Sequence, residues 1–164
     1  EELIEAFSVL QQETDVNIKL VISGKVSDRE FEEELLSLIS KDNDIHYFRN
    51  KIPVDEVQYH FRSADVCICP YRATLNSGVA HLAHTFGVPV IGPDIGGFKQ
   101  LLKEGGGLLF KQNDTESLLD SMRESLSLDM EKTSNEISNL NAKYYPSKIS
   151  NKFFDELLTF FDWR

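Results

Sequence analysis

The sequence predicts an α/β fold in which a doubly wound parallel sheet is flanked by helices. Short, nearly continuous apolar runs alternate along the chain with segments of helical periodicity. This alternation is typical of a parallel sheet that is covered on both faces. The clearest unit spans residues 65–97, where apolar runs at 66–69 and 88–91 flank a loop and a helical segment. Right-handed crossovers between such strands place helices on both sides of the sheet.

The size and composition are those of one ordinary globular domain. The chain has 164 residues, 41% hydrophobic and 27% charged, with a formal net charge of −10. An acidic chain without a basic stripe argues against nucleic acid as a partner, because Lys and Arg contacts to phosphate dominate that binding. No apolar run approaches the roughly 20 residues that a membrane span requires. We therefore expect a cytoplasmic protein without a membrane span.

Helices are expected where apolar residues recur at helical spacing or where a capping residue opens the segment. Residues 27–30 fit a capping box, Pro53 fits the first turn of a helix and Asp114 fits an N-cap. In the second helix, Phe31 and Leu35 are expected to point inward. The expected helices are 1–12, 27–40, 54–63, 78–86, 98–103, 114–128 and 147–161, with residues 130–145 weakly helical.

Strands are expected at 17–23, 45–49, 66–69, 88–91 and 108–110, where short apolar runs end at turn residues. In a doubly wound sheet, ligands bind beyond the carboxyl ends of the strands. The turns at 24–25, 50–51, 70–78 and 93–97 all follow strands, so they are expected to lie on one edge and to converge.

The turn Asn76-Ser77-Gly78 opens the helix that follows the strand at 66–69. The first N–H groups of a helix lack internal acceptors and lie at the positive end of the helix dipole, so such a turn suits a phosphate group. The alternative is a plain helix N-cap, because Ser and Asn are favoured there in any case.

Cys67 and Cys69 are the cysteines of the chain, and they stand two residues apart on an expected strand. Their spacing places both on one face, too far apart for ordinary disulfide geometry, so we expect buried, reduced thiols. His81 and His84 share one helix at a spacing of three residues, which is compatible with a common metal ligand set. No third ligand is evident, so no metal site is expected.

Several motifs together resemble one known family. ADVCICPYR is followed by SG and then by FGVPVIGPDIGG, and EELIEAFSVL, KLVISGK and GGGLLFKQNDTESLLDSM extend the likeness outward. This pattern resembles the C-terminal half of GT-B-fold glycosyltransferases of the group 1, or family 4, type. It covers residues 1 to about 125.

The resemblance implies a retaining, hexosyltransferase-type enzyme that moves a sugar from a nucleotide-diphosphate sugar to an acceptor during glycan or glycoconjugate synthesis. It implies one Rossmann-like nucleotide-sugar-binding domain over residues 1–164, with the family's first strand and its N-terminal acceptor domain missing from this chain. The donor is then a substrate, and no metal or other cofactor is needed. The partners are the donor and the missing N-terminal domain, and this chain alone is expected to be inactive.

Candidate site residues follow from the turn and from the resemblance. Gly24 matches the family's donor loop, although Val26 stands in place of its second glycine, and Ile52 stands where the family packs the base. Lys25 and Arg72 are the nearest positive charges and suit diphosphate oxygens, the alternative being ordinary surface charge. No catalytic residue is assigned beyond Arg72 as a possible diphosphate partner. The candidate substrate-binding residues are Gly24, Lys25, Ile52, Asn76, Ser77, Gly78 and Val79.

The family's pair of glutamates is missing. The resemblance places these carboxylates at Thr74 and Leu82, and the second typically holds the donor ribose. This departure supports an alternative reading, a catalytically degenerate GT-B-like domain that serves as a binding or scaffolding module. A third alternative is a flavodoxin-like or receiver-like domain. A receiver needs an acidic cluster at a strand end, and this sequence does not supply one.

Overall fold

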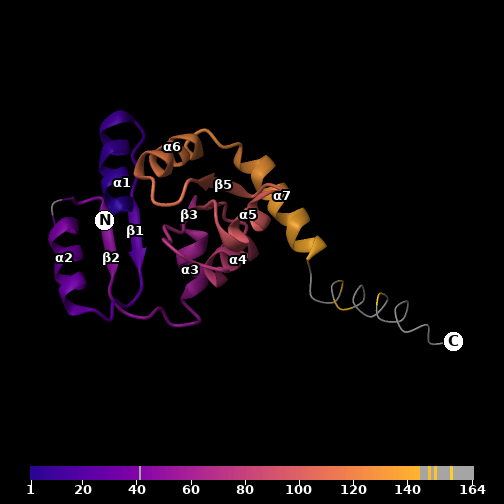
Figure 1. Cartoon of the computed structure of the whole chain (residues 1–164), viewed down its shortest axis with the longest axis horizontal. Coiled ribbons are helices and arrows are strands. Elements are labelled where there is room, and N and C mark those ends of the chain that lie inside the picture. The colour runs from indigo at the N-terminus through magenta and orange to yellow at the C-terminus, as the bar shows by residue number, and fades with distance from the viewer. Residues whose placement is uncertain (41, 145–147, 149, 151–155, 157–164) are drawn as a thin grey trace.

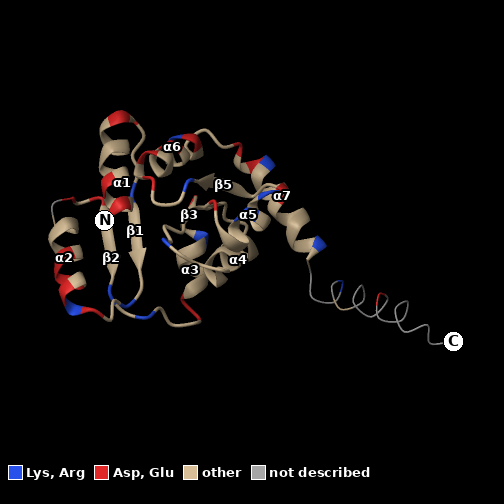
Figure 2. Ribbon diagram, in the orientation of Figure 1, with Lys and Arg blue, Asp and Glu red and all other residues tan. Residues whose placement is uncertain are grey.

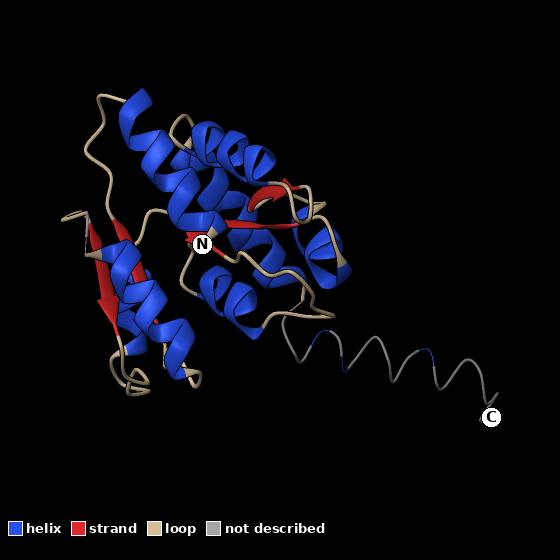
Figure 3. Ribbon diagram, turned by 60° about the vertical axis from the view of Figure 1, so that its left-hand side comes forward, coloured by secondary structure: helices blue, strands red, loops and turns tan. Residues whose placement is uncertain are grey.

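The computed structural model describes residues 1–40, 42–144, 148, 150 and 156 (Figure 1). In this part of the chain, helices and strands alternate for most of its length. Figure 3 shows helices packed around two groups of strands. The elements in order are α1 (Glu2–Glu13), β1 (Leu20–Ser23), α2 (Arg29–Ile39), β2 (Ile45–Phe48), α3 (Val57–Arg62), β3 (Cys67–Ile68), α4 (Gly78–Thr85), β4 (Val90–Pro93), α5 (Gly96–Leu102), β5 (Gly107–Phe110), α6 (Thr115–Ser125) and α7 (Met130–Lys143).

All strand pairs in the described residues are parallel, which confirms the predicted α/β class. Strand β1 pairs with β2, with Leu20 opposite Ile45, and β4 lies between β3 and β5. The strands form two sheets, β1-β2 and β3-β4-β5, rather than the one sheet that was expected. The boundary falls between β1 and β3, each of which is paired on one side only within the described part.

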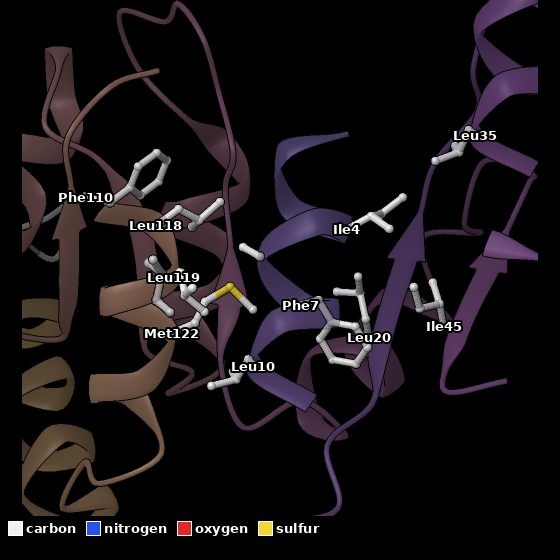
Figure 4. Packing of buried hydrophobic residues seen from close by; sticks show 12 residues of the cluster. Ile4, Phe7, Leu10, Leu20, Leu35, Ile45, Phe110, Leu118, Leu119 and Met122 are labelled. Carbon is white, nitrogen blue, oxygen red and sulfur yellow. The ribbon is translucent and has the colours of Figure 1, made fainter. Parts of the chain in front are cut away.

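The three-stranded sheet is covered on both faces, as a doubly wound arrangement requires. Successive side chains of a strand point to opposite faces, so Val90 and Ile91 of β4 enter different cores. Ile91 belongs to a core shared with α1, α6 and the two-stranded sheet (Figure 4). Val90 belongs to a second core with α4 and α5, in which Phe98 is 1% exposed.

Helix α1 connects the two sheets through the first of these cores. Its Phe7 is buried, and the same cluster contains Leu20 of β1 and Phe110 of β5. Figure 4 shows Phe7 close to Leu20, with α6 on the other side of α1. One hydrophobic core therefore holds the two sheets together although their strands are not paired.

Some element boundaries differ from the sequence-based expectation. Asp28, not Ser27, caps α2, because its carboxylate accepts the N–H groups of Glu30 and Phe31 at 2.9 and 3.2 Å. Phe31 is 44% exposed rather than inward, since it lies in the first turn beside the polar cap. Helix α3 begins at Val57, after a turn at 54–56. Apart from residues 148, 150 and 156, the expected helix 147–161 lies outside the described residues.

Acidic side chains are spread over several helices. Figure 2 shows Asp and Glu on α1 and α2 and around α6, while Lys and Arg are scattered over separate elements. Among the described residues, every helix is too short or too polar to cross a lipid bilayer.

Candidate functional site: the turn that opens helix α4

The turn before α4 has the geometry that its sequence predicts. Ser77 is the N-cap, with extended backbone angles and a side chain that accepts the Ala80 N–H at 3.1 Å. Ser77 is buried, whereas Gly78 and Val79 are exposed. The amides of Gly78 and Val79 lie in the first helical turn and have no acceptor within the described part of the chain. These amides and the helix dipole give the surface a positive potential without a formal charge, which suits an anion.

A second loop supports this turn. The Gly97 N–H donates to the Leu75 carbonyl oxygen at 2.7 Å, which joins the loop before α5 to the loop before α4. Gly96 has φ +49°, and a Cβ there would lie 2.5 Å from the Thr74 carbonyl oxygen. The turns at 70–78 and 93–97 therefore converge as predicted, and their close approach requires glycine.

Polar side chains lie beneath the turn at the end of β3. Ser77 interacts with Cys69 and with the hydroxyl of Tyr71, and burial raises the pKa of Tyr71. The hydrogen bond with Cys69, together with burial, raises the pKa of the Cys67 thiol, so this thiol is protonated at neutral pH. Both thiols are free, as expected; Cys69 is buried, whereas Cys67 is only half-buried. These groups therefore lie close together beneath the turn.

Arg72 stands on the same loop but already has a partner. Its Nη2 lies 3.0 Å from Oε1 of Glu2 in α1, while the side chain stays 69% exposed. The Gln112 side chain also donates to the Arg72 carbonyl oxygen. An exposed ion pair of this kind is weak, so a stronger anion can displace the glutamate.

The other predicted residues lie at the end of the two-stranded sheet. Gly24 donates its N–H to the Phe48 carbonyl oxygen at 3.1 Å, and the Tyr47 hydroxyl donates to the Gly24 carbonyl oxygen at 3.2 Å. Lys25 is exposed and Ile52 is half-buried. Within the described residues, no hydrogen bond connects this group with the turn at 70–78. A single site formed by both groups therefore stays a prediction.

The two histidines of α4 do not converge. His84 is 2% exposed, and its Nε2–H donates to the Gly106 carbonyl oxygen at 2.9 Å. Its Nδ1 is buried and has no hydrogen-bond partner among the described residues, and burial lowers the pKa of the ring. His81 is exposed instead. No cluster of three or more metal-ligating side chains occurs in the described part of the chain.

Thr74 and Leu82, at the positions of the family's carboxylates, lie on either side of the turn. The Thr74 hydroxyl donates to the Asn76 carbonyl oxygen at 2.7 Å, and Leu82 is 37% exposed on α4. Leu75 and Val79 are also exposed, 86% and 43% respectively. The surface beside the open amides is therefore apolar and uncharged on this helix face.

A comparison with protein-family models gives a match to Glycosyl transferases group 1 over residues 1–143. The chain belongs to this family. The match covers most of the chain, including the Ser77-Gly78 turn and both converging loops. It confirms the likeness that the motifs of residues 65–97 indicate.

Solved glycosyltransferase structures share the fold of this family member. Sucrose-phosphate synthase from Thermosynechococcus elongatus is 19% identical with a TM-score of 0.67, and the alignment covers 95% of this chain and 42% of that one. Anabaena HepE in complex with UDP is 15% identical with a TM-score of 0.75, covering 96% and 44%. Its complex with UDP-glucose gives 17% and 0.74, with the same coverage. A search of curated proteins gave no match.

These likenesses confirm the predicted C-terminal domain of a GT-B-fold, group 1 glycosyltransferase. The chain spans less than half the length of the solved structures that it matches.

A groove of about 670 Å³ between α1 and α2 contains none of the predicted site residues, and Ile4 and Leu38 line it. The convergence of the turns at 70–78 and 93–97 was predicted, but the hydrogen bond from the Gly97 N–H to the Leu75 carbonyl oxygen was not.

Proposed function

We propose that this chain is the donor-binding half of a retaining glycosyltransferase that moves a sugar from a nucleotide-diphosphate sugar to an acceptor. The observation that carries the proposal is the turn at Ser77-Gly78, whose amides are open in a member of the group 1 family. The solved HepE structures are complexes with UDP and UDP-glucose, so UDP is the first nucleotide to test.

The turn has a defined role in this chemistry. When the sugar leaves, negative charge grows on the departing diphosphate, and preorganised N–H donors stabilise that charge most when they are already aimed at it. The amides of Gly78 and Val79 supply such donors, and the dipole of α4 adds to them. Arg72 and Lys25 add positive charge, and Ile52 and Gly24 are the contacts proposed for the nucleoside. No step in this scheme requires a metal ion or another cofactor.

The donor-binding domain is proposed to act with parts that the described chain does not contain. The facing strands β1 and β3 are each paired on one side only in the described residues, while α1 packs against the core of both sheets. A further parallel strand between them would join the two sheets into one. We expect the acceptor to bind a separate N-terminal domain, the complete enzyme to be cytoplasmic and hexosyl-transferring, and residues 1–164 alone to transfer no sugar.

The variant Gly78→Pro tests the proposed donor turn. Proline removes one amide donor, and it suits the first position of a helix, so the fold should survive. Titration calorimetry with UDP should show affinity reduced by at least about tenfold, as expected for a lost hydrogen bond to a charged group. Thr115→Pro is the matched control, because Thr115 is the first residue of α6, distant in sequence from the turn.

Equal UDP affinity in Gly78→Pro and Thr115→Pro would rule out the amide turn as the phosphate site. The thermal unfolding temperature of both variants should remain close to that of the unaltered chain. Loss of folding in Gly78→Pro alone would also contradict the geometry, since Ser77 has backbone angles of φ −128° and ψ 110° that suit a following proline.

The second candidate function is a catalytically degenerate binding or scaffolding module. The observation in its favour is that Thr74 and Leu82 supply no carboxylate beside the turn. The full-length protein distinguishes the two candidates. Release of UDP from UDP-glucose in the presence of acceptor supports the transferase, whereas nucleotide binding without any turnover supports the module.

A further inference from the structure

The Thr74 side chain forms a hydrogen bond with the backbone of the turn that opens α4. Its hydroxyl donates to the Asn76 carbonyl oxygen at 2.7 Å, two residues further along the chain. The Thr74 side chain is half-buried, although the neighbouring Leu75 is 86% exposed. The hydroxyl therefore forms a hydrogen bond within its own loop.

This hydrogen bond fixes the peptide group that immediately precedes the open amides of Gly78 and Val79. The Asn76 carbonyl and the Ser77 N–H belong to the same planar trans peptide, so they point in opposite directions. Once the carbonyl is bonded to Thr74, the Ser77 N–H faces away from the Thr74 hydroxyl. The hydrogen bond from the Ala80 N–H to the Ser77 hydroxyl oxygen, at 3.1 Å, then fixes where the helix begins.

The preceding peptide is fixed by a second, independent contact. The Gly97 N–H holds the Leu75 carbonyl oxygen at 2.7 Å. The backbone of Gly96 and Gly97 packs so closely that an added Cβ at Gly97 would collide with the Asn76 side chain. Two consecutive carbonyls of the turn, those of Leu75 and Asn76, are thus held by donors from outside α4.

We propose that Thr74 is a positioning residue that presets the amide turn for a diphosphate. The inference rests on the proposed function, because the diphosphate is the ligand assigned there. The resemblance places a carboxylate at this position, but this chain has a neutral hydroxyl that is bonded to the backbone. Thr74 therefore contributes by orienting donors and not by contributing charge.

The test uses Thr74→Val, which keeps the shape of the side chain and removes the hydroxyl, and Thr74→Ser, which keeps the hydroxyl. Thr85→Val is the matched control, since the Thr85 hydroxyl also donates to a backbone carbonyl of α4, that of His81 at 3.0 Å. Two readouts are measured on each variant: UDP affinity by calorimetry, and exchange of the Gly97 amide hydrogen without nucleotide.

Thr74→Val should weaken UDP binding about fivefold, the effect of one ordinary hydrogen bond. It should also accelerate exchange of the Gly97 amide by a similar factor, because the turn opens locally more often. Thr74→Ser and Thr85→Val should match the unaltered chain within about twofold in both readouts, below the effect of one hydrogen bond.

Unchanged UDP affinity in Thr74→Val overturns the proposal. Weaker binding with unchanged Gly97 exchange also overturns it, because the hydroxyl would then contact the ligand directly. If the unaltered chain binds no UDP, the proposed function fails, while faster Gly97 exchange in Thr74→Val and not in Thr74→Ser still shows that Thr74 orders the turn.

Discussion

The Gly97 N–H lies 2.7 Å from the Leu75 carbonyl oxygen, and this hydrogen bond joins the loops that precede α4 and α5. The two loops meet at a distance that only glycine allows. At Gly96, which has φ +49°, a Cβ would lie 2.5 Å from the Thr74 carbonyl oxygen and 2.8 Å from that of Leu75. The donor turn is therefore formed by two segments of the chain together.

Gly96→Ala should destabilise the protein by about 1–3 kcal/mol, because the methyl group meets backbone atoms in a strained conformation. Gly78→Ala is the control, since a Cβ there meets nothing within 4 Å. This change should leave stability equal or raise it by up to about 1 kcal/mol. Urea unfolding of both variants gives the comparison, and equal stabilities would show that the loops do not pack as described.

Ser77→Ala should lower the free energy of unfolding by about 1 kcal/mol, because α4 loses its N-cap. It should also accelerate exchange of the Ala80 amide, whose hydrogen bonds to Ser77 Oγ at 3.1 Å. Asp114→Ala removes the cap of α6, where the carboxylate accepts the Ser117 N–H at 2.9 Å. Asp114→Ala should accelerate exchange at Ser117 and not at Ala80; the same pattern in both variants would contradict local capping.

Burial of His84 makes stability depend on pH. Desolvation lowers the pKa of the folded ring from the ordinary value of 6.5 and outweighs the opposing effect of the hydrogen bond to the Gly106 carbonyl oxygen. The unfolded chain therefore takes up a proton first as the pH falls. Stability is complete above about pH 6.5 and falls as the pH drops through the folded pKa.

His84→Gln should reduce this pH dependence, because a glutamine amide can still donate to the Gly106 carbonyl oxygen and does not titrate. Urea unfolding between pH 7.5 and 5 should show a smaller loss of stability in the variant than in the unaltered chain. Glu136, whose carboxylate accepts the Gly106 N–H at 3.3 Å, is present in both proteins, so the comparison isolates the change at residue 84. Parallel pH profiles would place the acid sensitivity elsewhere.

Phe7→Ala should destabilise the protein by about 3–5 kcal/mol, because it leaves a cavity in the core that both sheets share. Phe7 is 2% exposed and belongs to the cluster of Leu20 and Phe110. Amide exchange should accelerate in β1 and β5 together, since one core supports both sheets. Val16→Ala, at a side chain that is 57% exposed, should change stability by no more than about 0.5 kcal/mol. Acceleration in β1 alone would contradict a shared core.

Local sequence signals predicted most of the fold. Apolar runs located the strands, and Asp114 marked the start of α6 because a carboxylate cap acts within three residues. The capping box at 27–30, which implies Ser27 as the cap of α2, was wrong by one residue, since Ser and Asp both cap helices and only the backbone geometry separates them. The division into two sheets was not predictable, because strand pairing depends on distant neighbours that periodicity does not contain.

The candidate site was predictable only where it depends on residues that are adjacent in the sequence. The Ser77-Gly78 turn depends on adjacent residues, and the structure has it as expected. The contact between Gly97 and Leu75 depends on two loops meeting in space, and the hydrogen bond of Thr74 depends on a rotamer. No sequence pattern specifies either feature. Roles for Lys25, Ile52 and Arg72 in donor binding stay predictions.

Nuclear magnetic resonance titration of the isotope-labelled chain with UDP tests the central claim most directly. The account predicts weak, saturable binding at up to millimolar UDP, with the largest amide shifts at Ser77, Gly78 and Val79 and smaller shifts at Gly96 and Gly97. GDP and ADP titrations show whether the base contributes. Absence of shifts at Ser77 and Gly78 with millimolar UDP, GDP and ADP, or shifts confined to the groove between α1 and α2, would contradict it.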